Sequence, residues 1–286
     1  MSDVAFLGPA EIRRLVREIG LRPSKSRGQN FVIDANTVRR IVRTAELTDD
    51  DVVLEVGPGL GSLTLGLLAA ARHVTAVEVD RLLAEALPRT IAERAPAYAS
   101  RLTTVHRDAL TIDALPGAAP TALVANLPYN VAVPVLLHVL DAFPTLVSGL
   151  VMVQREVADR LVADPGSRVY GAPSAKAAWY AELRRAGSIA RTVFWPVPNV
   201  DSALVAWRRR EPPEPGVDRQ QAFAVVDAAF SQRRKTLRSA LATWAGSAGR
   251  ADQLVTAAGV APSARAEQLT ISDFARIAAM ASSTNE

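Results

Sequence analysis

The stretch Asp51-Val-Val-Leu-Glu-Val-Gly57-Pro-Gly59-Leu-Gly61 decides how this chain folds. An apolar, β-branched run, typical of a strand that is buried on both faces, passes directly into a glycine-rich turn, and an apolar segment with helical character follows. Glycines in such a turn let a ligand approach the backbone closely, beside the amides of the next helix. The Gly-x-Gly-x-Gly spacing is shorter than the Gly-x-Gly-x-x-Gly that wraps a pyrophosphate, which favours a ligand without a diphosphate.

Further short apolar runs follow the first one and alternate with longer helical patterns. They lie at 73–79, 101–106, 121–126, 149–154 and 202–207. This alternation predicts an open α/β sheet, mostly parallel, with crossover helices on both faces. A charged, proline-rich stretch at 208–216 is typical of a linker, and the pattern beyond it is helical. We therefore predict one domain over residues 1–216 and a small helical domain over 217–286.

The composition excludes several kinds of site. The chain has 286 residues, no cysteine and three histidines, which excludes disulfides, thiolate zinc sites and iron–sulfur clusters, so we expect no metal. Its apolar stretches are too short to span a bilayer, and no apolar core of a secretory signal follows Arg13, Arg14 and Arg17. We expect a cytoplasmic protein with no membrane partner and, in the absence of heptads, a monomer.

The charge is unevenly distributed along the chain. The net charge is +4, but residues 1–43 carry +5, residues 44–130 carry −5 and residues 231–286 carry +3. Two basic ends around an acidic centre suggest a polyanionic partner, although a merely soluble surface explains the asymmetry equally well.

Carboxylates follow two of the predicted strands. Glu78 comes 21 residues after Gly57, and a carboxylate at that point can accept hydrogen bonds from both hydroxyls of a ribose. The alternative is a strand-end carboxylate that simply faces solvent. Asp108, after the next strand, can accept a hydrogen bond from an adenine amine.

The most specific motif is Asn126-Leu-Pro128-Tyr129 at the end of the fourth strand. An amine that attacks a methyl group must turn its lone pair out of the aromatic ring. The Asn126 side-chain oxygen and the carbonyl of Leu127 or Pro128 can accept the two N–H bonds and impose that geometry, while Tyr129 offers a flat face to a base. The alternative is an Asn-Pro turn beside a partly buried tyrosine.

With these motifs the chain resembles the class I S-adenosylmethionine methyltransferases, and within them the ribosomal RNA adenine N6-dimethyltransferases. The resemblance extends from about Arg22 to Ile277. Its other motifs are Gly28-Gln-Asn-Phe31, Val153-Gln-Arg-Glu-Val157, Tyr170-Gly171 and Phe194-x-Pro196-x-Pro198-x-Val200-Asp-Ser202. Phe230-Ser-Gln-Arg-Arg-Lys-Thr-Leu-Arg238 and Arg265-Ala-Glu-Gln-Leu269 resemble the small-subunit branch, which is associated with kasugamycin sensitivity.

The resemblance implies a Rossmann-like fold with a mostly parallel seven-stranded sheet and a small C-terminal all-helical domain. It implies methyl transfer from S-adenosyl-L-methionine to N6 of two adjacent adenines in the 3′-terminal hairpin loop of small-subunit (16S) rRNA. The products would be N6,N6-dimethyladenosines and S-adenosyl-L-homocysteine, formed without a metal on rRNA or an immature small ribosomal subunit.

The resemblance also implies residue roles. The cofactor would contact Asn30, Val32, Gly57, Gly59, Glu78, Asp108 and Asn126. The catalytic positions would be Asn126, Pro128, Tyr129 and Phe194, with the two aromatic rings on either side of the target base. Two positions depart from the family: Val32 stands where leucine is usual, and Asn199 where lysine is common.

Basic residues near both ends are the expected RNA contacts. They are Arg22, Lys25 and Arg27 near the N-terminus, and Arg233, Arg234, Lys235 and Arg238 near the C-terminus, the latter on about one and a half turns of a predicted helix. A solvated helix face is the alternative for the second group.

Three other functions remain open at this point. One is methylation of a large-subunit rRNA adenine, which confers macrolide resistance, and another is methylation of adenine in DNA. The third is a ribosome-assembly factor whose methylation is incidental.

Overall fold

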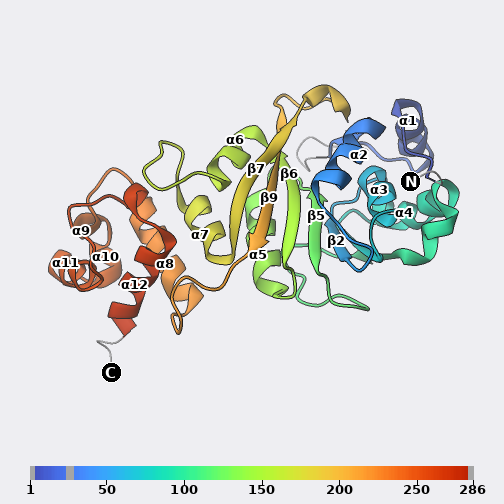
Figure 1. Ribbon diagram of the computed structural model, residues 1–286. Helices are drawn as coiled ribbons and strands as arrows, with labels where there is room; N and C mark the ends of the chain where they lie inside the picture. The colour runs from blue at the N-terminus through green and yellow to red at the C-terminus, as the bar shows by residue number, and fades with distance from the viewer. Residues whose placement is uncertain (1–3, 24–28, 283–286) are drawn as a thin grey trace. The chain divides into compact units, whose positions relative to one another are not determined.

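A computed structural model describes residues 4–23 and 29–282 (Figure 1). The chain divides into two compact units: Met1–Ala158 with Arg184–Arg209, and Asp159–Leu183 with Arg210–Glu286. Each unit is considered by itself.

The first unit is built on a seven-stranded sheet. Its strands are β2 (Val52–Val56), β3 (His73–Glu78), β4 (Leu102–His106), β5 (Ala122–Asn126), β6 (Ser148–Gln154), β7 (Ala181–Ile189) and β9 (Ser202–Arg209), in the order β4-β3-β2-β5-β6-β9-β7. Figure 1 shows β2, β5, β6, β9 and β7 in sequence across the sheet. Strands β4, β3, β2, β5 and β6 are parallel, and β9 is antiparallel to β6. The predicted mostly parallel, seven-stranded α/β sheet is confirmed.

The direction of the crossovers determines where ligands can bind. From β2 the chain proceeds outward to β3 and β4, then returns to β5 on the other side of β2. Because such crossovers are right-handed, α3 (Ser62–Leu68) and α4 (Arg81–Arg94) lie on one face of the sheet and α5 (Ala132–Ala142) lies on the other. The strand order reverses between β2 and β5, and a crevice opens at that point beyond the carboxyl ends of the strands.

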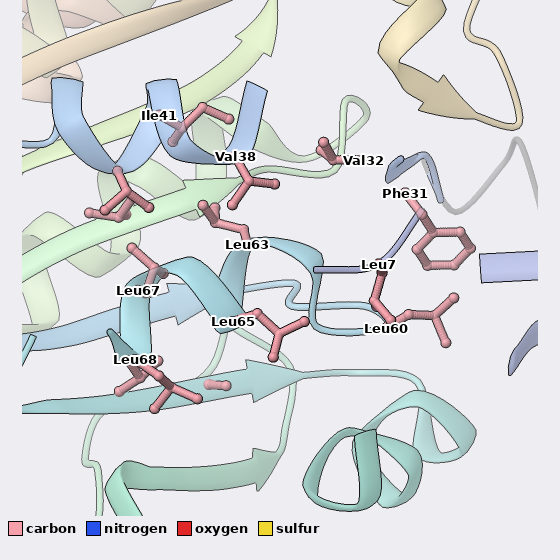
Figure 2. Packing of buried hydrophobic residues seen from close by; sticks show 14 of the residues in the cluster. Leu7, Phe31, Val32, Val38, Ile41, Leu60, Leu63, Leu65, Leu67 and Leu68 are labelled. Atoms are coloured by element: carbon pink, nitrogen blue, oxygen red, sulfur yellow. The ribbon is translucent and has the colours of Figure 1, made fainter. Parts of the chain in front are cut away.

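The N-terminal segment packs onto the same face as α3. It contributes α1 (Pro9–Glu18), α2 (Ala35–Thr44) and β1 (Phe31–Val32), which pairs with β8 (Phe194–Trp195). Figure 2 shows Val38 of α2 directed toward Leu63 of α3. A Cβ atom on Gly66 would lie 2.8 Å from Val38, so glycine permits this close packing of the two helices.

Apart from residues 181–183, which begin β7, the second unit has only helices as regular secondary structure in the residues described. It contains α7 (Ala172–Tyr180), α8 (Arg219–Ser231), α9 (Leu237–Ala240), α10 (Ala242–Ala245), α11 (Ala248–Ala257) and α12 (Ile271–Ser282), while α6 (Arg155–Leu161) crosses the division between the units. The predicted helical pattern after residue 217 is therefore observed.

The division between the units differs from the predicted boundary at residue 216, because residues 159–183 belong with the C-terminal helices. Side chains of α7 explain the difference. The rings of Trp179 and Tyr180 make edge contacts with Phe223 of α8, at centroid distances of 6.0 and 6.1 Å, and Lys176 forms an ion pair with Asp227 at 2.7 Å. Contacts between residues this distant in sequence leave no local pattern.

Two features near β9 were not predicted. The sequence pattern predicts no strand at the position of β7. This strand lies at the edge of the sheet and is half-exposed, and with Arg184, Arg185 and Gly187 it lacks the apolar run of the inner strands. The segment expected to begin a linker at residue 208 instead extends β9 to Arg209.

Arg209 has a structural role. Its Nε donates to the Leu146 carbonyl at 2.5 Å, and its Nη2 donates to the carbonyls of Leu140 and Phe143 at 2.8 and 3.0 Å. These bonds cap carbonyls at and just beyond the C-terminal end of α5, where helix carbonyls lack partners within the helix; the Phe143 carbonyl also accepts from the Leu146 amide at 3.1 Å.

Replacing Arg209 should therefore destabilise the protein. Arg209→Leu removes one donor from each of three carbonyls, and we expect it to lower the free energy of unfolding by about 2–4 kcal/mol in urea denaturation. The neighbouring Arg208 is the matched control: its side chain is 77% exposed and pairs with Glu46 at 3.5 Å, so Arg208→Leu should cost less than about 1 kcal/mol. Equal losses for the two variants would contradict this role.

Candidate active site

The carboxyl ends of β2, β3 and β5 surround a cavity of about 460 Å³. The residues that line it include all seven predicted cofactor positions and one further predicted position: Asn30, Val32, Gly57, Gly59, Glu78, Asp108, Asn126 and Pro128. The fold thus brings together side chains that are up to 98 positions apart in the sequence.

The glycine turn has a shape that other residues would strain. Gly57, Gly59 and Gly61 have φ angles of 69°, 58° and 94°, in the left-handed region. At Gly59 a Cβ atom would also lie 2.9 Å from the Phe31 ring of β1. The turn consequently lies close beneath the N-terminal segment, at one wall of the cavity.

Glu78 joins this turn to the end of β3. One carboxylate oxygen accepts a hydrogen bond from the Gly59 amide at 3.1 Å, and the other accepts from the Asp80 amide at 3.0 Å. The residue is only 5% exposed, which contradicts the alternative of a solvent-facing carboxylate. Burial raises the pKa of Glu78 above its usual value, in opposition to these two hydrogen bonds, which lower it.

Asp108 occupies the rim of the cavity. It is exposed and follows β4, and its Oδ1 accepts a hydrogen bond from the Leu110 amide at 2.9 Å. This local turn holds the carboxylate at the edge of the sheet, on the same side as Glu78.

Asn126 ends β5 at the wall of the cavity that faces the N-terminal segment. Its Nδ2 donates to the Asn30 carbonyl at 3.1 Å. Because the donor side of the amide is engaged in this way, Oδ1 is the atom left to accept a hydrogen bond from a ligand.

The two predicted base-stacking rings have different surroundings. Tyr129 is half-buried, its hydroxyl lies 2.6 Å from Ser202 Oγ, and it lines an adjoining cavity of about 430 Å³ together with Asn30 and Pro198. Phe194 is 0% exposed and pairs with Val32 in the two-stranded sheet of β1 and β8. In this structure Phe194 therefore offers no open face to a base.

Glu55 is a cavity residue that the sequence analysis did not select. It is 1% exposed, and its Oε2 has no hydrogen-bond partner among the described residues. Burial raises the pKa of Glu55 to about 8, opposed by the nearby Thr64 hydroxyl, which lowers it, and supported by a smaller contribution from Glu78. The signal in the sequence is a single acid between Leu54 and Val56 in an apolar strand. Two buried carboxyl groups in one cavity favour a cationic ligand.

The predicted RNA contacts are only partly described. Arg22 is exposed, while Lys25 and Arg27 lie outside the described residues. Arg234 and Lys235 are exposed, and Arg238 lies 3.9 Å from Asp252.

Arg233 has partners within the protein. Its Nε donates to Glu267 at 3.0 Å and its Nη2 to the Arg168 carbonyl at 2.7 Å. The predicted helix over 233–238 is wrong, because residues 232–236 form a turn between α8 and α9. The turn allows the Leu237 side chain to be buried while its amide donates to the Ala264 carbonyl at 2.8 Å.

Neither a metal-binding cluster nor a membrane-spanning helix is present among the described residues. Over residues 4–23 and 29–282, no group of three or more histidine, aspartate or glutamate side chains is arranged to hold a metal ion. Within the same ranges, every helix is too short or too polar to cross a bilayer.

Comparison with known proteins places this site in a family context. The family model described as Ribosomal RNA adenine dimethylase matches residues 21–283. Ribosomal RNA small subunit methyltransferase A of Thermobifida fusca (strain YX) is 66% identical over 277 residues, which is 97% of this chain and 96% of the relative. The protein of the same name from Streptomyces coelicolor is 67% identical over 275 residues, 96% of each chain.

Solved structures agree on the fold. A dimethyladenosine transferase from Plasmodium falciparum aligns with a TM-score of 0.73 at 20% identity, over 86% of this chain and 95% of that one. The 23S rRNA methyltransferase ErmE aligns with a TM-score of 0.65 at 29% identity, over 88% and 100%.

The raised pKa of Glu55 predicts a pH-dependent stability. Between its ordinary value of 4.5 and about 8, the folded chain holds a proton at Glu55 that the unfolded chain does not. The free energy of unfolding of the unliganded protein should therefore fall as pH rises through this range. Glu55→Gln removes this loss of stability. The melting temperature of Glu55→Gln minus that of the wild type should therefore be several degrees larger at pH 9 than at pH 6.

Glu46→Gln is the matched control for that measurement. The Glu46 side chain is 63% exposed, so its melting temperature should follow that of the wild type at both pH values. A Glu55→Gln difference that does not change with pH would show that Glu55 is ionised throughout.

Proposed function

The chain belongs to the ribosomal RNA adenine dimethylase family, and from this membership we propose that it transfers methyl groups from S-adenosyl-L-methionine to N6 of adenines in small-subunit (16S) rRNA. The finer proposal is that two adjacent adenines in the 3′-terminal hairpin loop each become N6,N6-dimethyladenosine. We further propose that the protein acts in the cytoplasm, as a monomer, on immature small subunits.

The observation that supports this function most directly is the chemistry of the cavity. An amide that can orient an amine, Asn126, shares the cavity with the carboxylates Glu78 and Asp108 and with the buried Glu55. The unpartnered Glu55 oxygen and the second buried carboxyl group fit a ligand that carries positive charge. S-adenosyl-L-methionine is such a ligand, and when bound it supplies an electrophilic methyl group on a sulfonium.

Several residues would hold this cofactor. Glu78 keeps lone pairs beyond the two that accept the Gly59 and Asp80 amides, and these suit the ribose hydroxyls. Asp108 suits the adenine amine. Asn30, Val32, Gly57 and Gly59 are proposed for the methionine end. Glu55, which holds a proton in the unliganded protein below about pH 8, would balance the positive charge of the ligand by releasing that proton.

Asn126 would orient the target amine. Its Oδ1 would accept one N6–H and the carbonyl of Leu127 or Pro128 the other, which turns the nitrogen lone pair toward the methyl group. The Leu127 amide donates to the Met152 carbonyl at 3.1 Å, so the turn that holds these acceptors is anchored to β6. The nitrogen becomes acidic once it is alkylated, and its proton can pass to water without a dedicated base.

Tyr129 and Phe194 would bind the target base. The hydrogen bond to Ser202 fixes the Tyr129 ring, which can stack on a base extruded from a hairpin loop. Because Phe194 is fully buried, its proposed place on the other side of the base requires the residues that cover it to shift when RNA binds.

RNA contacts are proposed from both ends of the chain. In the second unit Arg234, Lys235 and Arg238 would contact phosphates, while Arg233 positions their turn through Glu267 and the Arg168 carbonyl. Arg22, Lys25 and Arg27 are proposed for the N-terminal contact.

Mass spectrometry of rRNA tests the substrate. Incubation of the protein with isotope-labelled cofactor and unmethylated small subunits should give dimethylated adenines in 16S rRNA, and naked 23S rRNA should remain unlabelled. Labelling of 23S rRNA alone would favour the activity named for ErmE. Restoration of subunit assembly by an inactive variant, with no product on 16S rRNA, would favour an assembly factor.

Substitutions at Asn126 and Glu78 test the residue roles. Asn126→Ala should lower the single-turnover rate by about 100-fold or more while changing cofactor affinity only a few-fold, because it removes alignment of the amine. Glu78→Ala should mainly weaken cofactor binding, as measured by calorimetry. Wild-type turnover of Asn126→Ala on small subunits would refute the proposed mechanism.

A further inference from the structure

A second concave surface continues the cavity beside Tyr129. The first, which we call the base cavity, has a volume of about 430 Å³ and is lined by Asn30, Tyr129 and Pro198, among others. The second, the arginine cavity, has about 450 Å³ and is lined by Arg155, Glu156, Arg191 and Asp201. Gln154, Asn199 and Val200 line both, so the two cavities adjoin along a shared wall.

Asp201 fixes the wall of the arginine cavity. Its Oδ2 accepts a hydrogen bond from Arg155 Nη2 at 2.5 Å, and its Oδ1 accepts from the Arg191 amide at 3.1 Å. The Asp201 carbonyl also accepts from the Arg155 amide at 3.0 Å. The start of α6, the 3₁₀ turn Arg191–Val193 and the segment before β9 are thereby held together before any RNA binds.

The charges in this cavity are not equivalent. Arg155 neutralises Asp201, and Glu156 has an interaction of its own. The Arg191 guanidinium donates to the Asn199 carbonyl at 3.2 Å, a neutral acceptor, and is exposed. Arg191 therefore keeps a positive charge inside the arginine cavity, hydrogen-bonded to the backbone of Asn199 in the shared wall, where it can receive an anion.

An apolar surface accompanies this charge. Val197 and Val200 are 52% and 44% exposed, and they flank Asn199 on the segment that lines the base cavity. A cationic donor beside an exposed apolar surface matches a nucleotide, which presents a phosphate and the flat face of a base.

We propose that the arginine cavity binds the nucleotide adjacent to the target adenine, with the phosphodiester between them on Arg191. The proposal rests on the RNA substrate of the proposed function. The next nucleotide is covalently joined to the one in the base cavity, so its phosphate must lie close to that cavity, where the shared wall is. An enzyme that modifies two neighbouring adenines must also accommodate one while the other reacts, and this cavity is large enough for it.

The test measures binding of the full-length protein to unmethylated small ribosomal subunits over a range of salt concentrations. Arg191→Gln should weaken binding about tenfold and reduce the slope of log K against log salt by about 1, with cofactor affinity unchanged. Arg208→Gln is the matched control, since it removes another exposed arginine at the opposite end of β9 and should leave both quantities unchanged.

A gain-of-charge variant makes the test independent of any damage caused by Arg191→Gln. Asn199→Lys adds a cation to the shared wall and should tighten binding and increase the salt slope. The proposal is overturned if Arg191→Gln behaves like Arg208→Gln, or if Asn199→Lys fails to tighten binding. If the wild type methylates small subunits while either variant result fails, only this inference is lost; if the wild type leaves them unmethylated, the proposed function itself is wrong.

Discussion

The hydrogen bond from the Gly59 amide to the Glu78 carboxylate is the interaction on which the rest of the site depends. It joins the turn after β2 to the end of β3, across strands that are parallel neighbours in the sheet. The turn can make this bond only with left-handed glycines, and its place is also set by the Phe31 ring that packs against Gly59. The position of the cavity thus follows from one buried carboxylate and the backbone that it holds.

Burying carboxyl groups opposes the stability of the unliganded protein. Glu55 and Glu78 are both nearly inaccessible in one cavity, and burial raises the pKa of each. The backbone amides compensate Glu78, whereas one oxygen of Glu55 has no hydrogen-bond partner in the described structure. A cationic ligand would interact favourably with these buried carboxyl groups. The residues that destabilise the unliganded protein would therefore stabilise the protein with its ligand bound.

The substrate side depends on a different segment, residues 194–202. It carries Phe194 in β8, the exposed valines around Asn199, Asp201 in the wall of the arginine cavity and Ser202 beneath Tyr129. Because β9 is antiparallel to β6, this segment arrives at the carboxyl end of β6, next to the Asn126 turn. One irregular segment can therefore shape both the base cavity and its neighbour, with the sheet as a rigid support.

The sequence by itself determined the parallel strands, the glycine turn and the polar residues at strand ends, because each follows from a local pattern of apolar runs, glycines and charges. The meeting of Gly57, Glu78, Asp108 and Asn126 at one cavity follows for the same reason, since parallel strands place their carboxyl ends at one edge. The inclusion of Asn30 and Val32 rested on the family resemblance. Only the tertiary structure shows that β7 forms an edge strand and that residues 159–183 belong to the second unit. The same holds for the hydrogen-bond partners of Arg209 and Arg233 and for the burial of Phe194. Those outcomes depend on contacts between residues far apart in the chain. The position and burial of each of these side chains are determined by its partner in space and not by its neighbours in the sequence.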